Sequence, residues 1–152
     1  MADATHPSPS LSPSPPRVLI ADDCHDTTAT LALLLCHWGY DVRTVDNGLT
    51  AVEVAAVYRP DVVLLDIGMP GLDGLTVARR LREELRLDQA LLVCVSGFGQ
   101  EVDRQHALEA GCDYHLVKPV DLEALHALLA SGVRPRSSLP PARSAWQVCE
   151  LN

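Results

Sequence analysis

The sequence predicts a doubly wound α/β fold in which five parallel strands alternate with five helices. Short apolar runs alternate with longer segments of helical periodicity between residues 17 and 131, a pattern typical of repeated βα units. Three of the apolar runs contain almost no polar residue, as expected for strands buried on both faces of a parallel sheet. Right-handed crossovers then place helices on both faces of that sheet.

The elements follow one another in a regular order. The expected strands are RVLIA (17–21), DVRTV (41–45), DVVLL (61–65), ALLVCV (90–95) and DYHLV (113–117), and the expected helices are 26–39, 48–58, 75–85, 101–111 and 121–131. The second strand is the most polar of the five, which favours a place at the edge of the sheet. Gly39 suits the carboxyl-terminal cap of the first helix, and the pair Arg59-Pro60 ends the second.

The two ends of the chain differ in composition from the segment between them. Residues 1–16 are rich in Pro and Ser, and we expect them to form a disordered leader. Residues 132–152 are expected to form a flexible tail that carries one apolar cluster, Trp146, Val148 and Leu151. This cluster is either a short docking element or the end of a linker, and the second interpretation is favoured.

Charge and cysteine content exclude several classes of protein. The formal net charge of the 152-residue chain is −8, which argues against direct DNA binding because that needs a basic surface. There is no membrane-length apolar run and no signal peptide, so we expect a cytoplasmic protein. The five cysteines form no CxxC pair, and this odd, scattered set indicates reduced thiols rather than a disulfide framework or a zinc site.

Polar residues follow four of the five expected strands at their carboxyl ends. These ends meet at one edge of a parallel sheet, where ligands bind. Three carboxylates gathered there repel one another unless a cation lies between them, and Mg²⁺ is the expected ion. Each residue taken alone could be a helix cap, a turn residue or a surface charge, but their joint placement favours a site. The residues are Asp22 and Asp23, then Asp66, then Ser96 with Gly97, and finally Lys118 with Pro119.

The chemistry of this set suits the transfer of a phosphoryl group to a carboxylate. A carboxylate beside Mg²⁺ can act as a nucleophile and form an aspartyl phosphate. Lys118 can neutralise phosphoryl oxygens, and the Ser96 hydroxyl can donate a hydrogen bond to them. Gly97 has no side chain and leaves room beside the group. Asp26 directly precedes the helical run, so it is better placed than the acidic pair to cap the helix.

The motifs at this edge resemble the receiver domain of two-component response regulators. They are ADD (21–23), LLDIGMPGLDG (64–74), VSGFG (95–99) and LVKPVD (116–121), and the segment from 95 to 125 is similar to receivers of hybrid sensor kinases. The resemblance covers about Arg17 to Ser131 and implies the flavodoxin-like fold with strand order 2-1-3-4-5. It also implies a histidine kinase or histidine phosphotransfer protein as phosphodonor, Mg²⁺ as cofactor, and signalling through contacts with a downstream protein.

The resemblance further implies a role for each residue. Asp66 would be the phosphoacceptor. Mg²⁺ would be held by Asp22, Asp23, Asp66 and the Gly68 carbonyl, with Asp22 acting mostly through water. The phosphoryl group would be stabilised by Ser96, Gly97 and Lys118, and a conformational switch would be formed by Ser96, His115 and Pro119. His115 stands where many receivers carry Tyr or Phe. We expect it on the face of the fourth helix, fifth strand and fifth helix, where receivers meet partners and could form a homodimer. The Lys118–Pro119 bond is one that the family often holds cis.

Two other functions stay open at this point. A pseudo-receiver would bind partners without ever taking a phosphoryl group. A phosphatase of the haloacid-dehalogenase-like class also uses an aspartate nucleophile, Mg²⁺, a hydroxyl residue and a lysine, but its nucleophile follows the first strand and a second Asp lies two residues further. Here the first strand is followed by Asp22-Asp23, with no DxD. The segment after residue 131 is too short for a DNA-binding or enzymatic domain, so we expect a stand-alone regulator or a receiver cut from a longer chain.

Overall fold

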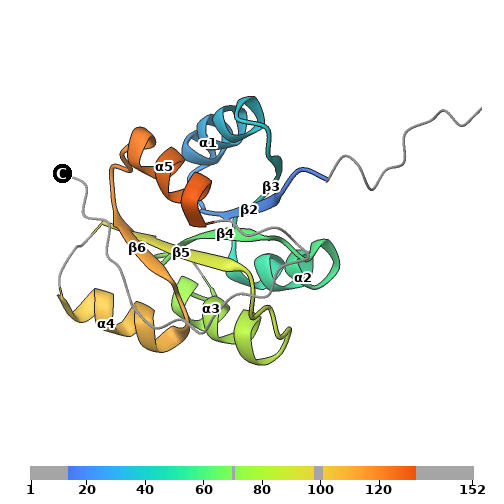
Figure 1. Cartoon of the computed structure of the whole chain (residues 1–152). Helices are drawn as coiled ribbons and strands as arrows, with labels where there is room; N and C mark the ends of the chain where they lie inside the picture. The colour runs from blue at the N-terminus through green and yellow to red at the C-terminus, as the bar shows by residue number, and fades with distance from the viewer. Residues whose placement is uncertain (1–13, 70, 98–100, 133–152) are drawn as a thin grey trace, which may run out of the picture.

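The computed structural model describes residues 14–69, 71–97 and 101–132, where five parallel strands alternate with five helices (Figure 1). Each predicted element is present, and most boundaries agree within one or two residues. The elements are β2 (Arg17–Ala21), α1 (His25–His37), β3 (Asp41–Val45), α2 (Gly48–Tyr58), β4 (Val62–Asp66), α3 (Gly74–Glu83), β5 (Leu91–Ser96), α4 (Glu101–Ala110), β6 (Tyr114–Val117) and α5 (Leu122–Gly132).

The sheet has the order β3-β2-β4-β5-β6, which is 2-1-3-4-5 in the order of the strands along the chain, as predicted. The more polar β3 lies at one edge and is partly exposed along its length, whereas every residue of β4 and β5 is buried. Helices α1 and α5 cover one face of the sheet, and α2, α3 and α4 cover the other (Figure 1). The fold is therefore the doubly wound α/β fold that the alternating pattern predicted.

Two hydrophobic clusters fill the space between the sheet and its helices. Leu19 and Leu65 point into the cluster with α2, α3 and α4, whereas their chain neighbours Ile20 and Leu64 point into the cluster with α1 and α5. Successive side chains of a strand face opposite ways, so a central strand must be apolar throughout. This is why the sequence shows continuous apolar runs there instead of alternation.

Two strands extend one residue beyond the predicted ends, and both added residues are polar. Asp66 is the last residue of β4 and lies in register with Val95, and Ser96 is the last residue of β5 and lies in register with Val117. The backbone hydrogen bonds of the sheet thus hold both residues in place. None of the five helices in the described residues has the length and apolarity that a membrane crossing requires.

The ends of the helices confirm one detail of the sequence prediction and correct another. Gly39 follows α1 with a φ of 101°, in the left-handed region that glycine favours after a helix, as predicted. Asp26 does not cap α1, because the helix begins at His25 and Asp26 lies in its first turn. Asn47 caps α2 by accepting a hydrogen bond from the Thr50 amide at 2.8 Å.

The prediction that the cysteines are all reduced thiols is wrong for one pair. Cys94 of β5 and Cys112, just before β6, form a disulfide with an S–S distance of 2.06 Å. Cys24 and Cys36 are free and exposed. The pairing joins residues 18 apart in the chain and arises because β5 and β6 are neighbours in the sheet, which cysteine spacing alone does not reveal.

A buried arginine joins α3 to the segments that precede β5 and β6. The Arg82 guanidinium lies 2.9 Å from the Asp113 carboxylate, and the two side chains are 8% and 12% exposed. Arg82 also donates hydrogen bonds to the carbonyls of Leu87, Ala90 and Gly111. With several carbonyls and one carboxylate around it, the guanidinium is well compensated for its loss of water.

We expect Arg82→Ala to lower the free energy of unfolding by about 3–5 kcal/mol, because it leaves the partly buried Asp113 carboxylate without its cation. Arg80→Ala on the same helix is the control. Arg80 forms an exposed i,i+4 pair with Glu84 at 3.0 Å, and losing such a pair costs about 0.5 kcal/mol or less. Urea unfolding followed by circular dichroism measures both, and equal losses would contradict a special role for Arg82.

Candidate functional site

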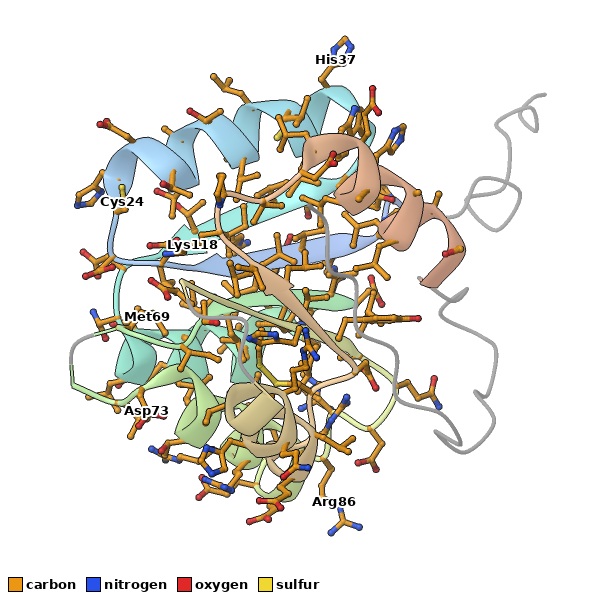
Figure 2. The ribbon with its side chains drawn as sticks, turned by 90° about the vertical axis from the view of Figure 1, so that its left-hand side faces the viewer. Cys24, His37, Met69, Asp73, Arg86 and Lys118 are labelled. Carbon is orange, nitrogen blue, oxygen red and sulfur yellow. A yellow bond between two sulfur atoms is a disulfide. The ribbon has the colours of Figure 1, made fainter. Side chains whose placement is uncertain are left out.

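The structure brings the predicted polar residues to the carboxyl-terminal edge of the sheet. In Figure 2 this edge lies on the left, where Cys24, Lys118 and Met69 are labelled. Four neighbouring strands deliver the side chains, so the sheet itself sets their spacing. β2 leads into Asp22 and Asp23, β4 ends at Asp66, β5 ends at Ser96, and β6 leads into Lys118.

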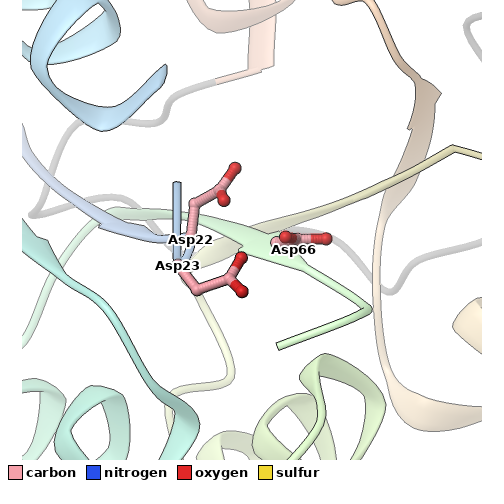
Figure 3. A group of neighbouring side chains, drawn as sticks. All are labelled: Asp22, Asp23 and Asp66. Atoms are coloured by element: carbon pink, nitrogen blue, oxygen red, sulfur yellow. The ribbon is translucent and has the colours of Figure 1, made fainter. Parts of the chain in front are cut away.

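Three carboxylates meet where β2 and β4 end (Figure 3). Asp22, Asp23 and Asp66 each place one carboxylate oxygen within 4.8 Å of the others. Asp22 and Asp66 are only 6% and 7% exposed, whereas Asp23 is open to solvent. Three hard oxygen ligands at this separation, with one side open for water, suit a small divalent cation.

The backbone around Asp66 holds its carboxylate in place. One carboxylate oxygen accepts a hydrogen bond from the Gly68 amide at 3.1 Å, and the Ile67 amide bonds to the Val95 carbonyl at 2.9 Å. Gly74, at the start of α3, packs against this strand end: a Cβ there would lie 2.6 Å from the Asp66 carbonyl oxygen. No role for Gly74 was predicted, although its place at the end of the LLDIGMPGLDG motif, directly before the expected helix at 75–85, is a signal for close packing.

Lys118 supplies a positive charge between the two buried carboxylates. Its ammonium nitrogen lies 3.3 Å from Asp66 and 3.7 Å from Asp22. Partial burial alone would lower the pKa of Lys118, but the negative charges of Asp66 and Asp22 outweigh it, so the pKa is raised. Lys118 is the one lysine in the whole sequence, and it stays fully charged at neutral pH.

The pKa of Asp22 is raised above the usual value for an aspartate. Burial is the largest effect and raises its pKa, and the charge of Asp66 raises it further. The Cys24 amide, which donates a hydrogen bond to the Asp22 carboxylate at 2.9 Å, and Lys118 act in the opposite direction. The net rise in the pKa of Asp22 means that burial and the charge of Asp66 outweigh the Cys24 amide and Lys118, and a further cation beside Asp22 would favour its ionised form.

Ser96 and His115 form a buried hydrogen-bonded pair. The Ser96 hydroxyl oxygen lies 2.8 Å from the Nε2 atom of His115, whose side chain is 0% exposed. The expectation that position 115 lies on a partner-binding surface is therefore wrong for its side chain. His115 lies in register with Cys94, so both point to the sheet face that α4 covers.

The structure says less about the roles predicted for Pro119 and Gly97. The Lys118–Pro119 bond is cis, and the Lys118 amide bonds to the Ser96 carbonyl at 2.8 Å, which ties the ends of β5 and β6 together. A Cβ at Gly97 would meet nothing within 4 Å, so packing does not require glycine there. Pro70 of the LLDIGMPGLDG motif lies outside the described residues.

Comparison with known proteins agrees with this geometry. The profile of the response regulator receiver domain matches residues 18–130, and the chain belongs to this family. The transcriptional regulatory protein PrrA of Mycobacterium tuberculosis is 41% identical over 130 residues, which cover 85% of this chain and 54% of PrrA. The chain thus spans about half the length of this relative.

Two solved receiver domains show the same fold. The BeF₃-activated receiver of RstA from Klebsiella pneumoniae matches with a TM-score of 0.72 and 30% identity, covering 78% of this chain and 98% of that one. The receiver of a Pseudomonas aeruginosa sensor histidine kinase matches with a TM-score of 0.69 and 28% identity over 78% and 97% of the chains. The latter was determined with a magnesium ion in its active-site cleft.

We expect Asp23→Asn to weaken Mg²⁺ binding by at least about tenfold, since even residues that only support a metal ligand cost about 10–100-fold when mutated. Ser96→Ala is the control, because its hydroxyl bonds to His115 and lies outside the carboxylate group, so it should change the Kd less than about threefold. Isothermal titration calorimetry with MgCl₂ measures both variants. Equal losses would show that Asp23 is not a direct ligand.

Proposed function

We propose that this protein is a phosphorylation switch that accepts a phosphoryl group on Asp66 from the phosphohistidine of a histidine kinase or a histidine phosphotransfer protein. The observation that carries the proposal is the placement of Asp66. It is held by the sheet at the end of β4, within 4.8 Å of two further carboxylates and 3.3 Å from the Lys118 ammonium. A carboxylate fixed beside a metal site and a cation is poised for phosphoryl transfer.

The residues divide the work of the transfer. One Asp66 oxygen forms a bond to phosphorus while the phosphorus–nitrogen bond of the donor breaks, and that electron pair stays on the imidazole nitrogen. Asp22, Asp23, the second Asp66 oxygen and the Gly68 carbonyl would hold Mg²⁺, which would supply positive charge to the phosphoryl oxygens. Lys118 would pair with another of these oxygens, and the Ser96 hydroxyl would donate a hydrogen bond to them.

The signal would leave the site through β6 and its flanking helices. Ser96, bonded to His115, and Lys118, joined to Pro119, link the phosphoryl site to the edge strand β6, and movement of these groups would bias the surface of α4, β6 and α5. Leu108 of α4 and Leu122 of α5 are 48% and 41% exposed, which supports contact with a downstream protein or a second copy through this surface.

We further propose that the functional unit is a receiver at 17–131, with a leader at 1–16 and a tail at 132–152, in a cytoplasmic protein that does not bind DNA directly. The family match to 18–130 supports the limits of the receiver. The acidic net charge of −8 supports protein partners over nucleic acid. Of the alternatives, the phosphatase is disfavoured by family membership, and the pseudo-receiver is distinguished by the first experiment below.

Incubation with Mg²⁺ and acetyl phosphate should add one phosphoryl group to the wild type, as intact-mass spectrometry would detect. Asp66→Asn should add none, because an amide oxygen is a far weaker nucleophile than a carboxylate. Asp46→Asn is the matched control, since Asp46 is an exposed acid that follows β3 at the same edge of the sheet, and it should be phosphorylated like the wild type. An unmodified wild type would favour the pseudo-receiver, and modified Asp66→Asn would overturn the assignment of the phosphoacceptor.

Lys118→Ala should separate phosphorylation from signalling. The Lys118 side chain is 37% exposed, and Mg²⁺ can compensate the two carboxylates that the substitution leaves without a cation. In the presence of Mg²⁺ we therefore expect the variant to stay folded and to keep its metal site. Asp66 should still be phosphorylated, but the amide chemical shifts of β6 and α5 should no longer move when the phosphoryl group is added. An unfolded variant, or shifts like those of the wild type, would contradict the role given to Lys118.

A further inference from the structure

A cavity of about 600 Å³ opens beside the carboxylates, on the face of the sheet that α1 and α5 cover. Its sheet side is aliphatic and is formed by Ile20, Leu64, Val95 and Leu116, one residue from each of four strands. Leu31 of α1 and Leu125 of α5 line its flanks. The phosphoryl chemistry described above uses none of these six side chains.

The arrangement of the two helices explains the space. The Trp38 ring, at the end of α1, stacks on the His126 ring of α5 with centroids 4.0 Å apart and planes 14° apart. The α1 residues that line the cavity, by contrast, all lie in its first half, from Asp26 to Leu31. The helices thus meet near the end of α1 and leave an opening near its start, where the chain passes the carboxylates.

The polar end of the cavity is negatively charged. Asp22, Asp26 and Asp66 line it together with one cation, Lys118, whose ammonium already lies between Asp66 and Asp22. Three carboxylates against one ammonium leave an excess of negative charge. Thr27 and Thr30 add hydroxyl groups at the α1 side of the cavity, so one end is anionic and hydrogen-bonding and the rest is hydrocarbon.

We propose that this cavity binds a cationic amphiphile: a primary amine on an unbranched hydrocarbon chain, with the ammonium at the carboxylates and the chain along the aliphatic side of the sheet. The volume of about 600 Å³ lies within the range of about 300–1,000 Å³ for small-molecule sites, which are mostly apolar with a few convergent polar groups. Charge selects the head group, because an anionic head would face three carboxylates.

Such a ligand would act on the proposed switch by occupying its carboxylates. The ammonium would lie against Asp22 and Asp66, which the proposed Mg²⁺ site also uses, so amine and metal would compete for the same carboxylates. The cavity site goes beyond the phosphorylation switch and does not depend on it, since the amine would bind the unphosphorylated protein in the absence of phosphodonor and metal.

Isothermal titration calorimetry of the full chain with decylamine, below its micelle concentration and without Mg²⁺, tests the proposal. We expect saturable binding at one site, and binding of decanoate at least about tenfold weaker, because its carboxylate meets like charge. Equal affinities for the two compounds, or no saturable binding of decylamine, would overturn the proposal. This comparison uses only the wild type, so it does not depend on the folding of any variant.

A matched pair of variants locates the ligand. Thr30 lines the cavity and is exposed, and its neighbour Ala29 is exposed but does not line it. Thr30→Trp should weaken decylamine binding at least about tenfold by occupying the cavity, whereas Ala29→Trp should stay within about threefold of the wild type. Equal affinities of the two variants would place the amine elsewhere and overturn the proposal. Both variants should still be phosphorylated by acetyl phosphate, and failure of that reaction in the wild type as well would count against the phosphorylation switch alone.

Discussion

The site depends on one ammonium group placed between two buried carboxylates. Asp22 and Asp66 are almost inaccessible to water, and ionised carboxylates in such a place are costly unless a cation compensates them. Lys118 lies within 3.7 Å of both. Every other fixed cation of the chain is an arginine, whose planar fork suits paired hydrogen bonds. A compact lysine charge can instead shift among carboxylate and phosphoryl oxygens. Lys118 compensates the burial of Asp22 only in part, so the pKa of Asp22 stays raised. A metal ion bound there would add the positive charge that is missing.

The second constraint is the bond between Ser96 and His115, which joins the site to the interior under α4. The hydroxyl group that is expected to meet a phosphoryl group already has a buried partner at 2.8 Å. A serine hydroxyl has one proton to donate, so bonding to a phosphoryl oxygen changes what it can offer to the imidazole. An imidazole can also change which nitrogen carries its proton. In the proposed switch, the pair would therefore couple the chemistry at the sheet edge to the packing beneath α4 without any exposed aromatic group.

The fold and most of the site residues could be predicted from the sequence, because residues that directly follow parallel strands meet at one edge of the sheet. Asp22, Asp23, Asp66, Ser96 and Lys118 each follow an apolar run, and parallel strands bring such residues together whatever the loops do. The burial of His115 could not be predicted, because β6 has only four residues, too few to show a pattern of buried and exposed positions. Both faces of β6 are covered by helices, and this depends on contacts between separate elements. The Cys94–Cys112 disulfide and the cavity depend on contacts between separate elements, and no local pattern encodes them.

The cavity and the carboxylate site are nevertheless consequences of the same strands. Ile20 lies two residues before Asp22, and Leu64 lies two residues before Asp66, so each pair points toward the same face of the sheet. Any ligand that follows the aliphatic side chains toward the edge therefore arrives at the acids. Helices α1 and α5 meet near the end of α1, and the cavity lies beside the first half of α1, next to these carboxylates. In this fold the cavity on the α1 and α5 face is continuous with the carboxylates of the proposed metal site, so a ligand of one would be positioned to influence the other.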